Sequence, residues 1–288
     1  MDASHNNTLI KLPMKVSVLM AAYNSNPELL RQAIMSVINQ TFTDFEFVIV
    51  DDGSKNPIEP IVRAISKDSR IVVYRKENTG LGSSLTYGIN KAKGEYIARI
   101  DDDDLMAHDR LEKQVKYLDE HPEVSCVGSH MNFYCNGRYI HYRKFPLEHE
   151  EIVKSMLTRK WAMAHTALMY RKESVEKAGC YRIKGTGEDL DLILQLSLVG
   201  KLANLDEFLL YYHISVGSLS STNSQLPGHL FALKEYKKSV DYQKFAKTVE
   251  QSLAMMEAEM IAPQKRCLHW KRKCAIRFIK WFGRRLPE

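Results

Sequence analysis

The chain has few cysteines and no long apolar run. Its 288 residues include only five cysteines, and no two of them form a C-x-x-C pair. An odd count without paired spacing argues against a disulfide framework and against a structural zinc site. No segment approaches the ~18 uninterrupted apolar residues of a membrane span. Residues 1–12 lack the apolar core of a signal peptide. We therefore expect a cytoplasmic protein with reduced thiols.

Two common phosphate-binding motifs are also missing. The dinucleotide fingerprint G-x-G-x-x-G does not follow the first strand-like segment, and the sequence has no P-loop lysine motif. NAD-dependent enzymes and P-loop ATPases are therefore disfavoured. The formal net charge of +6 is concentrated in residues 263–288, which hold nine Lys and Arg against one acid, so the rest of the chain has a net charge of −2. Such local basic character does not indicate a nucleic-acid-binding fold.

Strand-like and helical segments alternate through the first 123 residues. Apolar runs predict strands over 15–22, 45–50 and 71–74, and a fourth just before Asp101. Apolar periodicity predicts helices over 28–40, 58–66, up to 92 and over 109–120. This alternation is typical of an α/β fold, with a Rossmann-like, mostly parallel sheet and helices on both of its faces.

The pattern changes after residue 123. Asn136-Gly137 between two β-forming runs is a strong hairpin signal. Other segments predict a strand over 124–128, a helix over 148–157, a strand over 165–170 and a helix that begins at Glu188. This half of the chain is therefore predicted to be mixed α+β and to extend the same sheet.

Polar residues follow three of the predicted parallel strands. Tyr23-Asn24 follows the first strand, Asp51-Asp52 follows the second, and Asp101 to Asp104 follow the fourth. Ligands of α/β sheets bind outside the carboxyl ends of the strands. The three clusters are therefore expected to meet at a nucleotide site.

The four consecutive acids from Asp101 to Asp104 carry the strongest chemical signal. Adjacent carboxylates repel one another, so a folded chain keeps them together either in water or around a cation. Their oxygens suit hard divalent ions such as Mg²⁺ or Mn²⁺, which in turn bind phosphates. The alternative is a solvated acidic loop in which one Asp caps the helix that starts near His108.

Six short motifs occur in an order that resembles a known family. They are Ala22-Tyr23-Asn24, Val50-Asp51-Asp52-Gly53-Ser54, Asn78-x-Gly80, Gly94-Glu95-Tyr96-Ile97-Ala98, Asp101-x-Asp103-Asp104 and Glu188-Asp189. Over residues 14–220, the chain resembles a family 2 glycosyltransferase of the GT-A fold, similar to bacterial enzymes of O-antigen and capsule assembly.

The resemblance implies a role for each motif. Asp101 and Asp103 would hold the metal, with Mn²⁺ or Mg²⁺ as cofactor, and Asp189 would be the catalytic base. One of Asp51 and Asp52 would bind the uracil and ribose of a UDP-sugar. The remaining residues implied to border or support the substrate are Ala22, Tyr23, Asn24, Gly80, Arg99, Asp102, Asp104 and Glu188.

The chemistry of sugar transfer agrees with these roles. Negative charge develops on the leaving diphosphate, where a divalent ion stabilises it, and one carboxylate can take the proton of the attacking hydroxyl. Attack opposite the leaving group inverts the anomeric carbon, which gives a β-linkage from an α-linked donor.

Asp189 could instead be an ordinary first-turn helix acid, and His165 fits a structural histidine better than an acceptor contact. Relatives often read Tyr-Arg-x-His where this chain reads Tyr-His-Ile-Ser, which leaves the role of His213 open.

Residues 263–288 combine basic and apolar positions. Most of the Lys and Arg lie on one side of a helical wheel; the other side carries Cys267, Trp270, Cys274, Phe278 and Trp281. This pattern is typical of a helix that lies in a membrane surface, here an anionic one. The alternatives are a helix docked on the core and an RNA-binding tail. A membrane-bound tail indicates a lipid-linked acceptor at the inner face of a plasma membrane.

The expected protein is an inverting, metal-dependent glycosyltransferase. It would move galactose or glucose from a UDP-sugar to a saccharide on undecaprenyl diphosphate, with no nucleic-acid partner. Its expected divisions are a polar extension (1–13), a nucleotide-sugar-binding half (14–123), an acceptor-binding half (124–225), a helical connector (226–262) and the basic helix (263–288). Two other functions stay open, a sugar-nucleotide nucleotidyltransferase and a non-catalytic, membrane-associated adaptor. A nucleotidyltransferase would normally have a glycine-rich basic loop where this chain has Ala21-Ala22-Tyr23-Asn24.

Overall fold

The computed structural model describes residues 14–135, 137–183, 185–214 and 225–261. Within these ranges a nine-stranded sheet has the strand order β3-β2-β1-β4-β8-β6-β9-β5, and β7 pairs with β6 beside this path. The sequence correctly predicted its parallel half, in which all residues of the two central strands β1 and β2 are buried. This burial explains why both strands are mostly apolar. The four parallel strands are β1 (Val16–Ala22), β2 (Phe45–Asp51), β3 (Ile71–Arg75) and β4 (Tyr96–Arg99).

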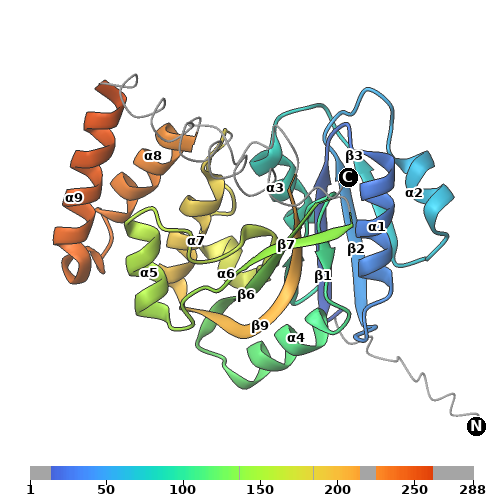
Figure 1. Cartoon of the computed structure of the whole chain (residues 1–288), viewed down its shortest axis with the longest axis horizontal. Helices are drawn as coiled ribbons and strands as arrows, with labels where there is room; N and C mark the ends of the chain where they lie inside the picture. The colour runs from blue at the N-terminus through green and yellow to red at the C-terminus, as the bar shows by residue number, and fades with distance from the viewer. Residues whose placement is uncertain (1–13, 136, 184, 215–224, 262–288) are drawn as a thin grey trace, which may run out of the picture.

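Helices cover both faces of the sheet, as predicted (Figure 1). One apolar core lies between the sheet and the helices α1 (Pro27–Ile38), α2 (Glu59–Ile65) and α4 (Arg110–Glu120). The other core contains the remaining helices: α3 (Leu81–Lys91), α5 (His149–Leu157), α6 (Lys172–Lys177), α7 (Glu188–Val199), α8 (Leu226–Tyr236) and α9 (Tyr242–Ile261).

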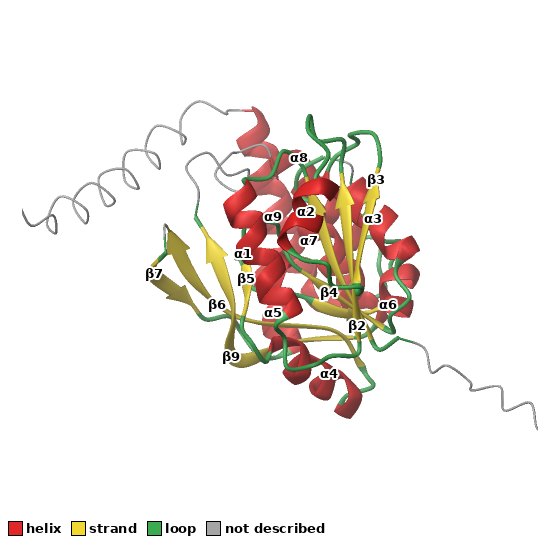
Figure 2. Ribbon diagram, turned by 90° about the vertical axis from the view of Figure 1, so that its right-hand side faces the viewer, coloured by secondary structure: helices red, strands yellow, loops and turns green. Residues whose placement is uncertain are grey.

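The second half of the chain completes the sheet with mixed pairing. Strand β8 (Met169–Arg171) is antiparallel to both β4 and β6 (Val124–Cys135), and β6 is parallel to β9 (Lys201–His213). The predicted hairpin is present: β6 pairs antiparallel with β7 (Arg138–Arg143). Figure 2 shows β6, β7 and β9 set apart from the parallel strands. The sequence did not predict β9 or the short strand β5 (Leu105–Met106), which pairs with its end.

The predicted strand over 165–170 is wrong in its first half. His165–Ala167 form a single 3-10 turn, and the strand begins only at Met169. Side chains determine this break. Nε2 of His165 lies 2.7 Å from the hydroxyl oxygen of Tyr181, and the buried guanidinium of Arg110 donates to the carbonyls of Thr166 and Leu168 at 3.0 and 3.2 Å. These contacts hold the turn in place just before the strand begins.

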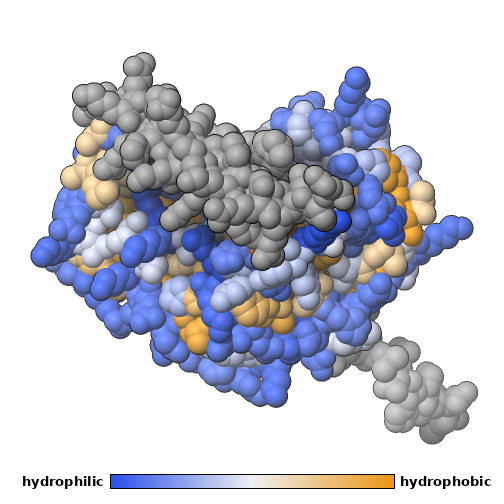
Figure 3. All heavy atoms as spheres, in the orientation of Figure 1, coloured by the Kyte–Doolittle hydropathy of each residue, from blue (hydrophilic) through white to orange (hydrophobic). Residues whose placement is uncertain are grey.

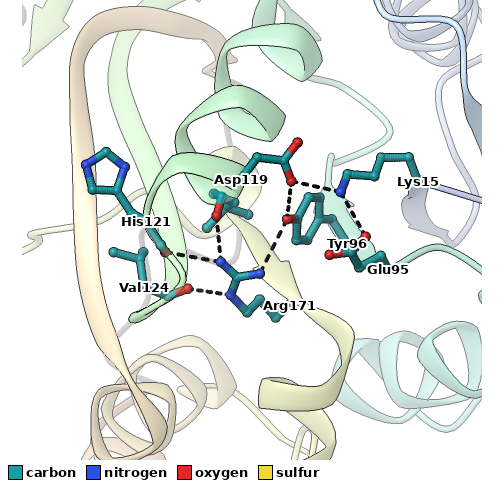
Figure 4. A network of polar contacts seen from close by, with 8 residues as sticks. Lys15, Glu95, Tyr96, Asp119, His121, Val124 and Arg171 are labelled. Atoms are coloured by element: carbon teal, nitrogen blue, oxygen red, sulfur yellow. Dashed lines mark hydrogen bonds and ion pairs between the residues drawn. The ribbon is translucent and has the colours of Figure 1, made fainter.

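A polar network fastens the end of β4 that lies away from the acidic loop (Figure 4). The ammonium of Lys15 lies 2.8 Å from Glu95 and 2.8 Å from Asp119 of α4. The hydroxyl of Tyr96 donates to Asp119 at 2.6 Å, and Arg171 of β8 donates to backbone carbonyls, including that of Val124 at 2.9 Å. Strand β4 and helix α4 are therefore held together at one end, which fixes the direction in which the other end points.

Two predicted segments, the polar extension (1–13) and the basic helix (263–288), lie outside the described residues. Among the helices that the structure describes, none has both the length and the apolar character to cross a membrane. Hydrophilic residues cover most of the face seen in Figure 3, with smaller hydrophobic areas between them.

Candidate active site

The parallel strands bring the predicted polar clusters to one edge of the sheet. Ala22 at the end of β1 is in register with Asp51 at the end of β2, and β4 ends beside β1 at Arg99. Ala22 is buried, whereas Tyr23 is 54% exposed at this edge. The backbone N–H of Asn24 donates to Ser54 Oγ at 2.9 Å, so the loops that follow β1 and β2 are tied together.

Asp51 and Asp52 are both buried, but they hold different loops. Asp51 accepts the backbone N–H of Ser54 at 2.9 Å and an N–H of Arg75 at 2.6 Å, so it closes its own turn. Asp52 accepts from Lys76 at 2.6 Å and from the backbone N–H of Gly80 at 2.9 Å. Gly80 has a φ of 91°, a conformation that favours glycine. Both aspartates thus shape the edge of the sheet before any ligand binds.

Three of the four consecutive acids form one cluster. Carboxylate oxygens of Asp101, Asp103 and Asp104 lie within 4.8 Å of one another. Asp102 points elsewhere, because its carboxylate accepts from the hydroxyl of Ser25. The predicted metal pair Asp101 and Asp103 is therefore together, with Asp104 as a third member that the sequence had given only a supporting role.

Two buried arginines hold this cluster in place. The guanidinium of Arg99 is fully buried and donates to Asp101, and Asp101 also donates its backbone N–H to Thr166 Oγ1 at 3.0 Å. Arg110 is fully buried too and donates to the carbonyl of Arg99 at 2.8 Å. Since Arg99 is inaccessible, it positions Asp101. Nothing in the sequence marked Arg110. Its guanidinium donates to the side chain of Gln114 and to the backbone carbonyls of Arg99, Thr166 and Leu168.

The cluster holds more negative charge than its surroundings neutralise. Burial and the nearby charges of Asp101 and Asp102 raise the pKa of Asp103 to about 7, although Arg99 partly offsets this. Burial, Asp101 and Asp103 raise the pKa of Asp104 well above its usual range. A divalent cation would relieve both effects, because it replaces lost hydration and separates like charges.

The donor atoms of the cluster fit a hard divalent ion. Asp104 accepts the backbone N–H of His213 at 2.8 Å through Oδ1, but its buried Oδ2 has no hydrogen-bond partner. Nδ1 of His213 is likewise buried without a hydrogen bond, and it lies 3.9 Å from Asp103 Oδ2. Burial lowers the pKa of His213, so this nitrogen is a neutral donor at pH 7. The carboxylate oxygens suit Mn²⁺ and Mg²⁺.

The Glu188-Asp189 pair opens helix α7 within electrostatic reach of the acidic loop. Burial raises the pKa of Glu188 to about 7, and the charges of Asp189 and then Asp101 add to this effect. The pKa of His165 also depends on both the acidic loop and the Glu188-Asp189 pair. Burial and then Arg99 lower its pKa to about 4, while Asp189 and Asp101 act in the opposite direction. Asp191, two residues further on, is buried and bound to Arg182 at 2.9 Å, so it is part of the core.

Two glycines bring helix α8 against the loop before Asp189. Gly187 has a φ of 94°, and a Cβ added to it would lie 3.1 Å from the Cα of Gly228. A Cβ on Gly228 would lie only 2.1 Å from the carbonyl oxygen of Thr186. The two backbones therefore touch without a side chain between them.

The structure gathers the polar loops at one edge of the sheet, with a cluster of three acids that could hold a metal ion and a separate carboxylate pair. The model of the family described as "Glycosyl transferase family 2" matches residues 17–179. The chain belongs to glycosyltransferase family 2. Its GT-A fold is therefore the expected one for this family, and the candidate base Asp189 lies just beyond the matched segment.

Relatives in this family include enzymes with polysaccharide-related names. The amylovoran biosynthesis glycosyltransferase AmsE of Erwinia amylovora is 30% identical over 67% of this chain and 74% of its own length. The O-antigen biosynthesis glycosyltransferase WbnJ of Escherichia coli is 32% identical over 69% of this chain and 79% of its own length. A glycosyltransferase from Rickettsia bellii is 37% identical over 44% of this chain, but the match spans only 18% of that longer protein.

Solved structures agree on the fold. The crystal structure of S. aureus TarS residues 1–349 in complex with UDP-GlcNAc superposes with a TM-score of 0.68 over 84% of this chain and 71% of that chain. At 20% sequence identity, this likeness concerns the fold alone.

Proposed function

We propose that this family 2 glycosyltransferase moves a hexose, either galactose or glucose, from a UDP-sugar to a saccharide on undecaprenyl diphosphate. The product would be a β-linked unit of a bacterial surface polysaccharide such as O-antigen or capsule. The names of AmsE and WbnJ support the polysaccharide context. The UDP-GlcNAc and UDP in the TarS complexes support a UDP-sugar donor.

One observation carries the proposal. The cluster of Asp101, Asp103 and Asp104, whose negative charge its surroundings do not fully neutralise, stands in the loop at the carboxyl edge of the sheet, and Asp189 lies in the first turn of helix α7. The charges of Asp101 and Asp189 both act on the partly buried His165. A transferase that inverts configuration needs this separation of roles, with a cation site for the leaving group and one carboxylate for the nucleophile.

The residues divide the reaction between them. Asp189 accepts the proton of the acceptor hydroxyl, whose oxygen forms a bond to the anomeric carbon as the bond between that carbon and the diphosphate oxygen breaks. UDP leaves from the opposite face, so configuration inverts. A divalent ion held by Asp101 and Asp103 would, when bound, neutralise the charge that develops on the departing diphosphate. Tyr23, Asn24, Asp52 and Gly80 border the nucleotide, while Arg99, Asp102, Asp104 and Glu188 support the site.

Release of UDP from a panel of UDP-sugars tests this function. We expect the full chain with Mn²⁺ to release UDP from UDP-glucose or UDP-galactose even without acceptor, because water can replace the sugar hydroxyl. Release should stop with EDTA and return with excess Mn²⁺. A chain that instead produces diphosphate from UTP and a sugar 1-phosphate is a nucleotidyltransferase, and one that neither binds UDP nor turns it over is an adaptor.

The proposed acceptor also implies contact with a membrane. Deleting residues 263–288 removes nine Lys and Arg together with the aromatic residues Trp270, Phe278, Trp281 and Phe282. We expect the full chain to sediment with anionic vesicles at moderate salt and the shortened chain to stay in the supernatant. Equal sedimentation of both forms would assign membrane contact, if any, to another surface.

A further inference from the structure

A cluster of stacked rings lies on one face of the β6–β7 hairpin. Phe133 packs nearly parallel to His141, with ring centroids 6.3 Å apart and an interplanar angle of 8°. It also packs edge-to-face on Trp161 at 6.2 Å and on Tyr212 at 5.7 Å. The guanidinium carbon of Arg143 lies 5.0 Å from the centre of the Trp161 ring. We call Phe133, His141, Arg143, Trp161 and Tyr212 the aromatic face.

The hairpin is exposed and carries positive charge only. Every residue of β7 except Ile140 is exposed, including His141 and Arg143 of the aromatic face. Phe133, Trp161 and Tyr212 are partly buried and pack against the core, so only part of each of these rings faces solvent. Residues 124–147 contain no Asp or Glu, but they contain Arg138, Arg143 and Lys144. Lys144 pairs with Asp206. Within the described part of the chain, no acid pairs with Arg138 or Arg143, and partial burial lowers the pKa of Arg143. An arginine that lies over an aromatic ring and has no acidic partner can pair with an external anion.

The aromatic face adjoins the candidate active site along two paths of the chain. Tyr212 and His213 are consecutive in β9, so their side chains lie on opposite faces of the strand, and the link to the cluster is the backbone N–H of His213, which donates to Asp104. Trp161 stands four residues before His165, which senses the charges of both Asp101 and Asp189. In the sheet, Phe133 is in register with Tyr212, so hairpin and site share one continuous strand pair. Figure 1 shows β7 crossing in front of the sheet towards β1.

We propose that the aromatic face binds the acceptor, a saccharide that carries a diphosphate ester. The C–H face of a sugar ring packs on the rings, which are large, rigid apolar surfaces. Arg143, with Arg138 further along β7, pairs with the diphosphate oxygens in the bidentate geometry that suits a guanidinium. This inference rests on the proposed function and assigns its acceptor to named residues.

Single-stranded nucleic acid also binds aromatic and basic surfaces, but the net charge of this chain argues against it as the ligand. A nucleic-acid groove carries many cations along the backbone path. Here the chain outside residues 263–288 has a net charge of −2. Arg143 over Trp161, with Arg138 at the other end of β7 and no acidic partner for either among the described residues, matches one short anionic group next to one or two sugar rings better than a long polyanion.

Trp161 provides a direct readout of this binding. The chain has three tryptophans, so the full-length double variant Trp270→Phe/Trp281→Phe keeps Trp161 as its sole indole. The probes are the undecyl diphosphate ester of N-acetylglucosamine and the neutral undecyl N-acetylglucosaminide, which has the same sugar and chain. We expect the diphosphate probe to change the Trp161 fluorescence in a saturable way and the neutral probe to bind at least about tenfold more weakly, since hydrogen bonds to charged groups contribute ~1.5–3 kcal/mol each.

Substitutions on the hairpin should act on this probe and not on the donor. In the same background, Arg143→Gln should weaken the diphosphate probe about tenfold, and His141→Ala should weaken both probes by loosening the ring stack. The matched control is Arg63→Gln on α2, an exposed arginine paired with Glu59, which should change nothing. Calorimetric binding of UDP with Mn²⁺ should stay within about twofold in all of them, a difference of less than ~0.5 kcal/mol.

The outcomes separate the two proposals. If UDP binds with Mn²⁺ but Arg143→Gln and His141→Ala leave the diphosphate probe unchanged, the acceptor assignment is wrong while the transferase function stands. Tighter binding of oligo(dT) than of the diphosphate probe would assign the face to nucleic acid instead. If the parent chain binds no UDP, the proposed function itself fails.

Discussion

Replacing Asp103 with asparagine is expected to lower metal-dependent UDP release by about 10²–10³-fold, the usual cost of losing one charge-stabilising group in a transition state. Asp103 shares the cluster with Asp101 and Asp104, and its carboxylate lies 3.9 Å from the unbonded Nδ1 of His213. The amide keeps the shape of the side chain but loses the charge that would hold the cation. Initial rates over a Mn²⁺ titration measure the effect.

The same substitution should stabilise the metal-free protein. Burial and neighbouring acids raise the pKa of Asp103, so its ionised form is disfavoured in the folded state. Removing about 1 kcal/mol of repulsion should raise the melting temperature by about 2–4 °C without metal. It should also abolish the further increase that Mn²⁺ gives the parent chain.

Asp109→Asn is the matched control for this prediction. Asp109 lies six residues further along, is 41% exposed and pairs with Lys113 on the surface. Its rates and melting temperatures should equal those of the parent. A fully active Asp103→Asn variant would remove Asp103 from the metal site.

Replacing Asp189 with asparagine should lower the rate of transfer by about 10²–10⁴-fold, the range typical of a lost general base. UDP and Mn²⁺ should still bind with parental affinity, because the donor edge of the sheet is left intact. Steady-state kinetics with calorimetry of UDP binding separates the two effects. Asp191→Asn on the same helix is the contrast. Asp191 is buried and bound to Arg182, so that variant should lose stability and keep its rate per folded molecule.

The Asp189→Asn variant should also change how stability depends on pH. The folded-state pKa of Glu188 is about 7, above its unfolded value of 4.5, first because of burial and then because of the charge of Asp189. The folded protein therefore holds a proton on Glu188 that the unfolded chain releases, and stability falls as pH rises from about 4.5 to 7. With the neighbouring charge gone, the fall should be shallower. Melting temperatures from pH 5 to pH 8 measure it, and identical slopes would show that Asp189 does not act on Glu188.

The parallel half of the fold was predictable because local patterns determine it. The buried strands β1 and β2 are mostly apolar, although β1 contains Ser17 and β2 contains Glu46, and polar residues stand at the edge of the sheet where each strand ends. Strand β9 was not predicted, because its inward and outward positions lack a clean alternation and its pairing with β6 has several register shifts. The turn at His165 depends on Tyr181 and Arg110, which no local pattern connects to it.

In the candidate site, too, local patterns predicted some features and tertiary contacts determine the others. The order of the motifs predicted that Asp101, Asp103 and Asp189 belong to one site, and the structure gathers Asp101 with Asp103 and Asp104. The roles of these residues stay predictions. The sequence did not indicate that Asp102 would turn to Ser25, or that His213 would lie against Asp103. Such contacts arise from tertiary packing, which brings together residues as far apart as 110 positions.

Helix α8 packs directly on the turn that precedes Asp189. Their backbones meet at Gly187 and Gly228, where even a single added carbon on Gly228 would clash at 2.1 Å with Thr186. This backbone contact leaves little room for one element to move without the other. Any force that shifts the C-terminal helices is therefore transmitted to the carboxylate that must meet the incoming hydroxyl, so the alignment of the reacting atoms is set partly from outside the nucleotide half.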